Sequence, residues 1–220
     1  MRSVNVKKLA MLGMLAAIAY VVMVIGRLPL VPSVGFLKYD PKDAVIAISG
    51  LMFGPLPALG VTVVVSLIEM FTVSETGWIG LIMNIVSTAA FVCPAVLIYR
   101  KDRTIRGAII GLLAGTLTMT GVMVLWNYLL TPIYMGYPRK AVAEMLLPAF
   151  VPFNLLKAGL NSALVLLLYK PLMRILRALK FMPESTGGAV SKKSKVGVLI
   201  FSLALLATCI LIVLALRGIL

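Results

Sequence analysis

The stretch Pro148-Ala-Phe-Val-Pro-Phe-Asn-Leu-Leu-Lys-Ala-Gly-Leu-Asn161, which continues as an apolar run to Tyr169, decides the fold class of this sequence. It has the length of roughly 20 residues that a helix needs to cross the hydrocarbon core of a bilayer, yet it contains Lys157. At about 100° per residue, Asn154, Lys157 and Asn161 fall within an arc of roughly 60° on one helix face. A lysine near the middle of a membrane helix costs on the order of 3 kcal/mol on insertion scales, so we expect this polar face to bind something.

The composition indicates an all-α integral membrane protein with several spans. The chain has 220 residues, of which 61% are hydrophobic and 13% charged. Its net charge of +14 is then explained by basic cytoplasmic loops and does not indicate nucleic-acid binding. Cys93 and Cys209 both lie in apolar spans, so no disulfide framework is expected. The basic N-terminus precedes an apolar run without a small-residue cleavage site, which favours a retained first helix over a cleaved signal peptide.

Hydropathy and turn residues predict seven helices. We place them at about 8–27, 43–53, 55–73, 78–99, 105–131, 148–170 and 196–217. Gly54-Pro55 ends the short second helix, because proline cannot continue the hydrogen-bond ladder of a helix. The alternative is that segments two and three form one kinked span.

The distribution of basic residues favours two separate spans. With two spans, fourteen lysines and arginines lie on one side, at 2–8, 100–106 and 170–195, against six on the other. The positive-inside rule then places the N-terminus in the cytoplasm and the C-terminus outside the cell membrane. We therefore divide the chain into a six-helix membrane domain (1–180), a polar and basic cytoplasmic linker (181–195) and an additional seventh transmembrane helix (196–220).

Polar residues inside the predicted spans lie at one level. Glu69 and Lys157 are the two charged residues that we place clearly within the membrane, and Asn84, Asn127 and Asn154 also lie in the half of their helices nearer the outside. This arrangement predicts a polar, outward-facing pocket formed by helices three to six. The alternative is structural: polar residues join helices to each other, and Lys157 forms a buried salt bridge with Glu69.

Small residues and the first outer loop have separate interpretations. Gly13 and Ala17 lie four residues apart on the first helix, and such pairs let helices approach closely, either within the protein or on another membrane subunit. For a stripe of glycines at 107, 111 and 115 on the fifth helix, we expect internal packing. The loop from Leu28 to Lys42 is rich in Pro, Gly and aromatic residues, so we expect a structured loop that serves as a lid over the pocket.

Several kinds of chemistry are excluded by missing residues. The chain contains no histidine, which removes Ser-His catalysis, Cys-His catalysis and histidine-based metal sites. It has no Gly-x-x-x-x-Gly-Lys-Ser/Thr loop for ATP hydrolysis. We expect no catalytic residues, no metal and no cofactor, and we interpret the polar residues as a binding site.

Four short motifs resemble those of the riboflavin-specific substrate-binding (S) components of energy-coupling-factor (ECF) transporters. They are Tyr39-Asp-Pro-Lys-Asp43, Phe53-Gly-Pro55, Trp126-Asn-Tyr128 with Thr131-Pro-Ile-Tyr134, and Pro152-Phe-Asn-Leu-Leu-Lys157. The resemblance covers about residues 9 to 175. It implies a six-helix bundle, so the seventh helix is a departure from the family.

The resemblance also implies a function in vitamin uptake. Such a protein captures riboflavin from outside and docks, here through Gly13 and Ala17, onto a transmembrane coupling subunit that carries two ATPases. The ligand-binding residues that we predict are Lys157, Asn154, Asn127, Asn84, Glu69, Tyr39, Asp40 and Asn161. The alternatives are an S component for another vitamin or flavin-like compound, an ion-coupled secondary transporter that uses Glu69 and Lys157, and an intramembrane enzyme.

Overall fold

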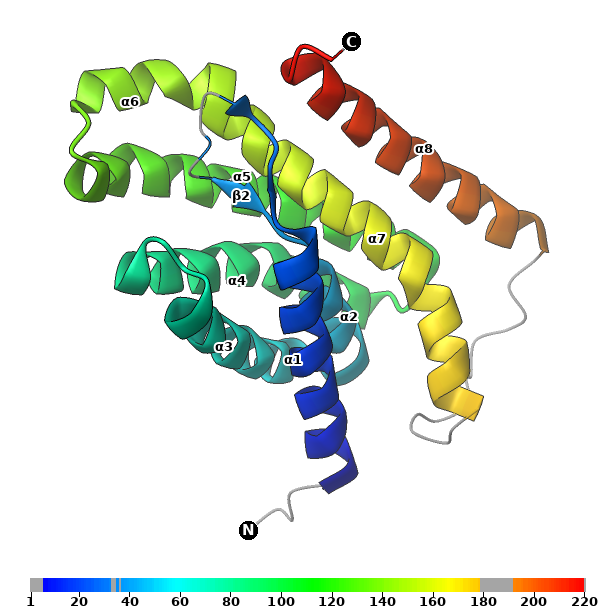
Figure 1. Ribbon diagram of the computed structural model, residues 1–220. Coiled ribbons are helices and arrows are strands. Elements are labelled where there is room, and N and C mark those ends of the chain that lie inside the picture. Colours follow the sequence, from blue (N-terminus) through cyan, green and yellow to red (C-terminus); the bar gives the residue numbers. More distant parts are fainter. Residues whose placement is uncertain (1–5, 33–34, 36, 179–191, 220) are drawn as a thin grey trace.

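The computed structural model describes residues 6–32, 35, 37–178 and 192–219, and almost all of these residues are helical (Figure 1). The long helices pack as a bundle, with the N-terminus and the C-terminus at opposite ends of the molecule in this view. The elements are α1 (Val6–Gly26), β1 (Leu28–Pro29), β2 (Lys38–Tyr39), α2 (Lys42–Phe53), α3 (Pro55–Thr72), α4 (Gly77–Lys101), α5 (Ile105–Met135), α6 (Arg139–Met145), a π-helical turn (Leu146–Phe150), α7 (Val151–Ala178) and α8 (Lys192–Leu216). Six helical segments of the described chain are long and apolar enough to cross a membrane.

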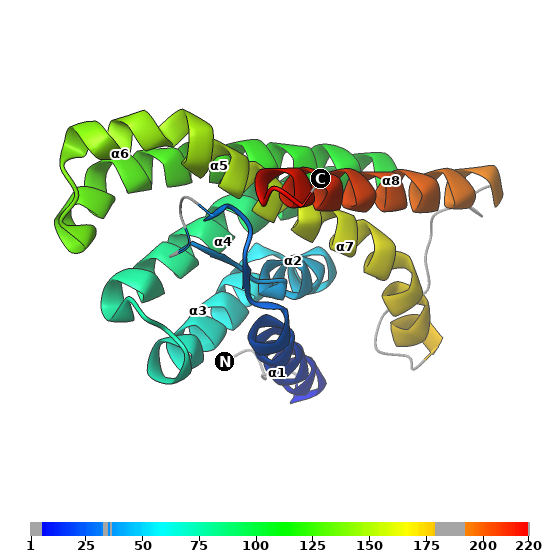
Figure 2. The same cartoon turned by 45° about the horizontal axis from the view of Figure 1, so that its top comes forward.

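Helix α2 is short and lies at the centre of the bundle, in contact with α1, α3, α4 and α7 (Figure 2). Every residue from Lys42 to Leu51 is buried. Its 12 residues extend only about 18 Å at 1.5 Å per residue, less than the roughly 30 Å of a hydrocarbon core, yet its last residue, Phe53, lies against Lys8 of α1, so α2 returns the chain to the side of the N-terminus. The predicted break after it is confirmed: Gly54 adopts a φ of 99°, which favours glycine, and Pro55 begins α3.

The glycine stripe of α5 packs inside the bundle, against α4. A Cβ atom at Gly111 would collide with the carbonyl of Ala95, and one at Gly115 would collide with the carbonyl of Phe91. These two positions therefore let the backbones of α4 and α5 approach closely, as the packing interpretation of the stripe expects.

Two predicted helices were too short. Helix α5 continues through Pro132 to Met135, and the helix predicted to start at Pro148 begins at Arg139 and runs through α6 and the π-helical turn into α7. Pro148 lies inside the π-helical turn. A proline lacks the amide hydrogen of a regular helix, and the wider π-helical turn accommodates this gap without ending the helix.

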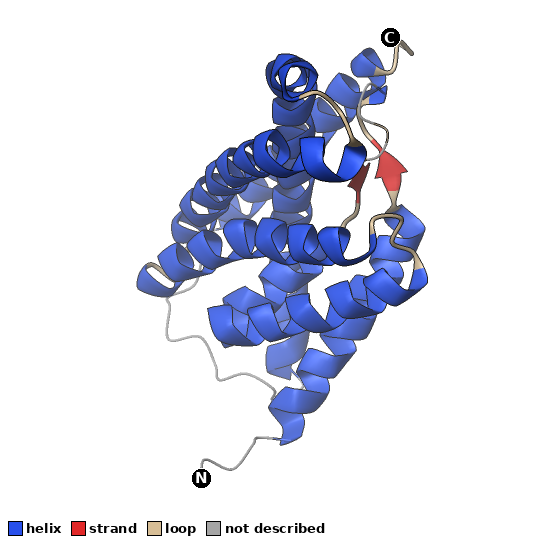
Figure 3. Cartoon of the chain, turned by 90° about the vertical axis from the view of Figure 1, so that its left-hand side faces the viewer, coloured by secondary structure: helices blue, strands red, loops and turns tan. Residues whose placement is uncertain are grey.

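The two short strands and α8 complete the fold. Strands β1 and β2 pair antiparallel, Leu28 with Tyr39 and Pro29 with Lys38, near one end of the bundle (Figure 3). Helix α8 packs along α7 and begins at Lys192, four residues before the predicted start at 196. Most of the predicted linker at 181–195 lies outside the described residues.

Candidate functional site

The segment 28–41, which we call the lid loop, connects α1 to α2, and its described residues (28–32, 35 and 37–41) fold back over one end of the helices. The side chains of Leu30, Val31 and Leu37 are buried although they belong to a connecting segment. The guanidinium of Arg27, at the start of the loop, donates a hydrogen bond to the carbonyl of Val73 at 2.7 Å. At the other end of the loop, Lys38 forms an ion pair with Glu75. Both contacts fasten the lid loop to the turn between α3 and α4.

The Lys38–Glu75 ion pair lies at the surface of the protein. The Glu75 carboxylate accepts a hydrogen bond from the Lys38 ammonium, and this bond, together with the attraction between the charges, lowers the pKa of Glu75 below its ordinary value. Because the pair is exposed to solvent, its strength depends on pH and ionic strength.

A first cavity lies beneath the lid loop, between α4, α5 and α7. Polar groups from these three helices converge on it, together with two residues of the lid loop. Its lining residues are Leu37, Lys38, Met83, Asn84, Ser87, Met123, Asn127, Phe153, Asn154 and Lys157. A small number of polar groups in a largely apolar surface is the usual form of a small-molecule site.

A second cavity adjoins the first, and the two share Leu37, Lys38, Met83 and Asn84. It is more polar and extends toward the turn between α3 and α4. Its remaining lining residues are Arg27, Asp40, Glu69, Ser74, Glu75, Thr76 and Tyr134. Because the two cavities share lining residues, one ligand could contact both.

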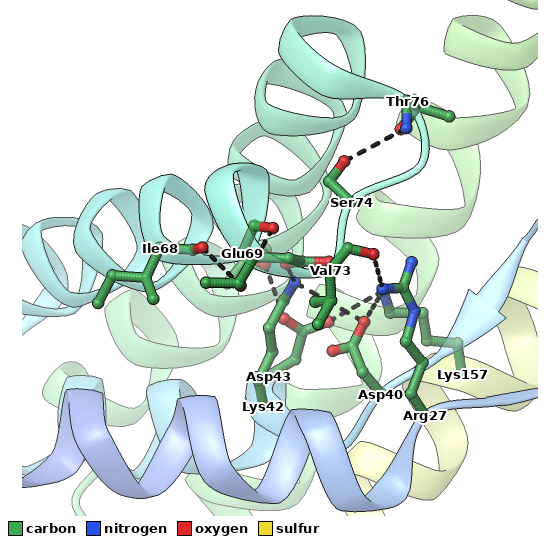
Figure 4. A network of polar contacts seen from close by, with 12 residues as sticks. Arg27, Asp40, Lys42, Asp43, Ile68, Glu69, Val73, Ser74, Thr76 and Lys157 are labelled. Carbon is green, nitrogen blue, oxygen red and sulfur yellow. Dashed lines mark hydrogen bonds and ion pairs between the residues drawn. The ribbon is translucent and has the colours of Figure 1, made fainter.

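Five charged side chains form a buried cluster beside these cavities (Figure 4). The Nζ atom of Lys157 lies 3.5 Å from Oδ2 of Asp40 and 3.5 Å from Oδ2 of Asp43. The ammonium of Lys42 forms an ion pair with Glu69 and lies 3.7 Å from Oδ2 of Asp40. All five side chains are at most 6% exposed.

This cluster corrects two expectations from the sequence. Lys157 is paired with Asp40 and Asp43, and Glu69 with Lys42, so the alternative of a buried Lys157–Glu69 salt bridge is not the pairing that the structure has. Glu69 and Lys157 are also not the only buried charges, because α2 begins at Lys42 and carries Lys42 and Asp43 into the bundle. A run of three charged residues immediately before an apolar helix, 40–43, was the sequence signal for this.

The charge of Asp40 depends on the same cluster. Burial alone would raise the pKa of this carboxyl, but the charges of Lys157, Lys42 and Arg27 outweigh burial and hold the pKa below its ordinary value. Asp40 is therefore ionised at neutral pH, and its Oδ1 atom is buried without a hydrogen-bond partner in the described structure, which leaves an acceptor free beside the second cavity.

The predicted asparagines have different surroundings. Asn84, Asn127 and Asn154 line the first cavity. Asn127 is tied to its own helix, because its Nδ2 donates to the carbonyl of Met123 at 2.7 Å and its Oδ1 accepts from Thr131 at 3.0 Å. Asn154 Nδ2 likewise donates to the carbonyl of Phe150 at 2.8 Å, which leaves its Oδ1 available to the cavity.

Asn161 and Tyr39 lie away from the lining of both cavities. The Oδ1 atom of Asn161 accepts a hydrogen bond from the amide of Ala44 at 3.2 Å, and its Nδ2 donates to the carbonyl of Asp40 at 3.4 Å. Asn161 thus joins α7 to the end of the lid loop and the start of α2. Tyr39 is packed among apolar residues of the lid loop and α7.

The arrangement suits binding of a small molecule with several hydrogen-bonding groups. Asparagine side chains donate and accept, the Lys157 ammonium donates, and the carboxylates accept. Among the described residues, no group of three or more His, Cys, Asp or Glu side chains is arranged to hold a metal ion.

Comparisons with known proteins show the family to which the chain belongs. The family model "ECF transporter, substrate-specific component" matches residues 7–169. The chain is 31% identical to riboflavin transporter RibU of Streptococcus thermophilus over 78% of this chain and 85% of the relative. It is 29% identical to RibU of Staphylococcus aureus over 78% and 93%, and 27% identical to riboflavin transporter FmnP of Bacillus subtilis over 70% and 85%.

A solved structure has the same architecture. It is described as the S component of a bacterial ECF transporter, is 29% identical in sequence and superposes with a TM-score of 0.68. The match covers 79% of this chain and 99% of the solved chain. The family model alone accounts for most of the chain, including α1 to α5 and the part of α7 that carries Lys157. This multi-pass membrane protein therefore belongs to the family of substrate-specific components of ECF transporters.

Proposed function

We propose that this protein is the riboflavin-capture subunit of an ATP-driven vitamin importer in the cell membrane and has no catalytic activity of its own. The observation that carries this proposal is the first cavity, in which Asn84, Asn127, Asn154 and Lys157 converge beneath the lid loop. Riboflavin is the molecule named for three relatives of this chain.

The chemistry of riboflavin fits both cavities. Its isoalloxazine ring is flat and presents two carbonyls and ring nitrogens along one edge, which Lys157 and the asparagines can bind. Its ribityl chain carries several hydroxyls, which match the more polar second cavity with Asp40, Glu69 and Thr76. In this pose, Lys157 is the ligand anchor, and Tyr39 and Asn161 support the lid loop and α2.

Delivery across the membrane requires partners. We propose that the exposed face of α1 around Gly13 and Ala17 docks onto a transmembrane coupling subunit associated with two ATPases. Nothing lies within 4 Å of a Cβ atom built at Gly13, so this face is open to a partner helix. The basic residues at 100–106 favour a cytoplasmic N-terminus, and α8 then ends outside.

A direct test uses the absorbance spectrum of the detergent-purified protein, together with quenching of its two tryptophans on addition of riboflavin. We expect a flavin spectrum or saturable quenching at or below micromolar ligand. If neither is seen and the protein binds another compound from a panel of vitamins, then it is the substrate-binding subunit for that compound.

Transport assays separate the remaining alternative. Uptake by an S component stops when the ATPases are removed and does not depend directly on the proton gradient. Uptake that survives removal of the ATPases but collapses with an uncoupler would support an ion-coupled transporter that uses the buried Glu69 and Lys157.

A further inference from the structure

Asp43 has an unusual position for a buried carboxylate beside a ligand site. It is 0% exposed and contributes to the lining of neither cavity. Its Oδ1 atom accepts a hydrogen bond from the hydroxyl of Thr88 at 2.6 Å, and its Oδ2 atom lies 3.5 Å from Nζ of Lys157. Asp43 therefore joins α4 to the lysine that lines the first cavity.

Lys157 lies between two carboxylates from different parts of the chain, Asp43 in α2 and Asp40 in the lid loop. An ammonium group carries three N–H donors, so two flanking carboxylates leave one for a ligand. Two anchors also restrict a long side chain with many rotamers, and such preorganisation lowers the entropy lost on binding.

We propose that Asp43, fixed by Thr88, is a positioning residue that directs the ammonium of Lys157 into the first cavity. This proposal rests on the proposed riboflavin site. Asp43 itself does not touch the ligand, and its effect on affinity is transmitted through Lys157.

The test is a double-mutant cycle read by riboflavin quenching of tryptophan fluorescence. Asp43→Asn keeps the size of the side chain and removes its charge, and we expect it to weaken binding about tenfold. In a Lys157→Met background, Asp43→Asn should change the affinity less than about twofold, because the residue through which it acts is gone.

A second pair of variants, which changes only a threonine hydroxyl, tests the proposal if Asp43→Asn does not fold. Thr88→Val removes the bond that fixes Asp43, whereas Thr62→Val removes a buried threonine whose hydroxyl bonds to the carbonyl of Ala58 in its own helix. We expect weaker binding for Thr88→Val alone. Equal effects of the two threonine variants, or equal effects of the Asp43 variant with and without Lys157, would overturn the proposal. Failure of the wild-type protein to bind riboflavin would instead refute the proposed function.

Helix α8 supports a second, independent inference. The family match ends at residue 169, before this helix begins. Helix α8 packs closely on α7, because a Cβ atom at Gly159 would lie 3.1 Å from Sγ of Cys209. The family model therefore does not include α8 and assigns it no role.

The outer part of α8 belongs to the same apolar cluster as the lid loop. Cys209 and Val213 of α8 are buried in one cluster with Leu30, Val31 and Tyr39 of the lid loop and with side chains of α7. Burial, followed by the charges of Asp40 and Asp43, raises the pKa of Tyr39, which lies in the same apolar cluster as Cys209 and Val213 of α8.

We propose that α8 retains the lid loop in its closed position by covering the apolar side chains that the loop presents to α7. Opening of the lid loop then requires these side chains to leave a surface that α8 helps to form. An S component with this additional helix opens its lid less often than one without it.

Hydrogen–deuterium exchange of the lid-loop amides in the full-length, ligand-free protein tests this directly. Val213→Ala removes contact area in the cluster, and Cys209→Phe overfills the contact with Gly159. The controls Leu211→Ala and Ile210→Phe alter side chains of α8 that are 54% and 46% exposed. We expect exchange in segment 28–41 to be at least about threefold faster in both test variants and unchanged in the controls.

The outcome does not depend on riboflavin, so failure of the proposed function leaves this test intact. Exchange in segment 28–41 that is the same for Val213→Ala and Leu211→Ala would overturn the proposal. Faster exchange throughout the protein would also count against it, because α8 would then stabilise the fold as a whole and not the lid loop.

Discussion

Lys42, in the first turn of α2, forms a buried ion pair with Glu69, near the end of α3. The two side chains are 1% and 5% exposed, so neither charge is compensated by water. The pair connects the central helix of the bundle to the helix that lines the second cavity. Glu69 is thereby occupied by Lys42, which leaves Lys157 to Asp40 and Asp43.

Loss of one member of this pair is expected to destabilise the protein. Lys42→Met leaves Glu69 as an uncompensated buried charge, and removal of one partner of such a pair costs about 3–5 kcal/mol. The measurement is the apparent Tm in detergent. The double variant Lys42→Met/Glu69→Gln should recover most of the loss, since no unpaired charge remains. A double variant that is as unstable as the sum of the two single ones would contradict a direct pair.

Asn84 offers the cleanest separation of ligand binding from folding. It lines both cavities, whereas Asn161 bonds to the backbone of Ala44 and Asp40. Asn84→Ala should weaken riboflavin binding by up to about tenfold, the value of one hydrogen bond, with little change in Tm. Asn161→Ala should lower Tm, because it breaks bonds that hold α2. A Tm loss in Asn84→Ala as large as that in Asn161→Ala would show that Asn84 is structural.

The sequence predicted the bundle more completely than the charged cluster. The lengths of the apolar runs and the Gly54-Pro55 break were sufficient to locate the helices, because each of these signals lies within one stretch of the sequence. The partners of Lys157 are not local: Asp40 and Asp43 precede it by more than a hundred residues, and periodicity within one helix carries no information on which carboxylate lies opposite. Glu69 was the plausible partner of Lys157 because it lies within a predicted span. The burial of Asp40 and of the residues at the start of α2 was not expected, because loop residues are usually exposed.

The Lys38–Glu75 pair predicts how the lid loop responds to pH and salt. The pKa of Glu75 is lowered in the folded protein, so its contribution is fully present above the ordinary glutamate pKa of 4.5. It is lost only as the pH falls below that value, through the lowered pKa. Because Glu75 stays ionised above its ordinary pKa, this pair should make riboflavin dissociation no more sensitive to pH between about pH 6 and 8.

Salt provides the matched control for the same pair. Glu75→Gln should speed riboflavin dissociation by no more than about threefold at low ionic strength, because an exposed ion pair contributes little. At high salt the wild-type protein should approach the variant, since screening weakens the pair. A salt effect of equal size in Glu75→Gln would place the sensitivity elsewhere in the protein.

Variants on the exposed face of α1 should impair delivery of the vitamin without impairing its binding. Gly13→Leu and Ala17→Leu add bulk to a face that the bundle does not use, so riboflavin binding and Tm should stay within the error of the wild-type protein. Close helix approach at small residues is lost, so association with the coupling subunit and uptake in cells should fall at least about tenfold. Gly121→Leu is the control. A Cβ atom at Gly121 also meets nothing within 4 Å, but Gly121 lies on α5 and not on the proposed docking face. Equal uptake in the Gly13 and Gly121 variants would exclude α1 as the docking face, and loss of binding in Gly13→Leu would mean that this face supports the fold.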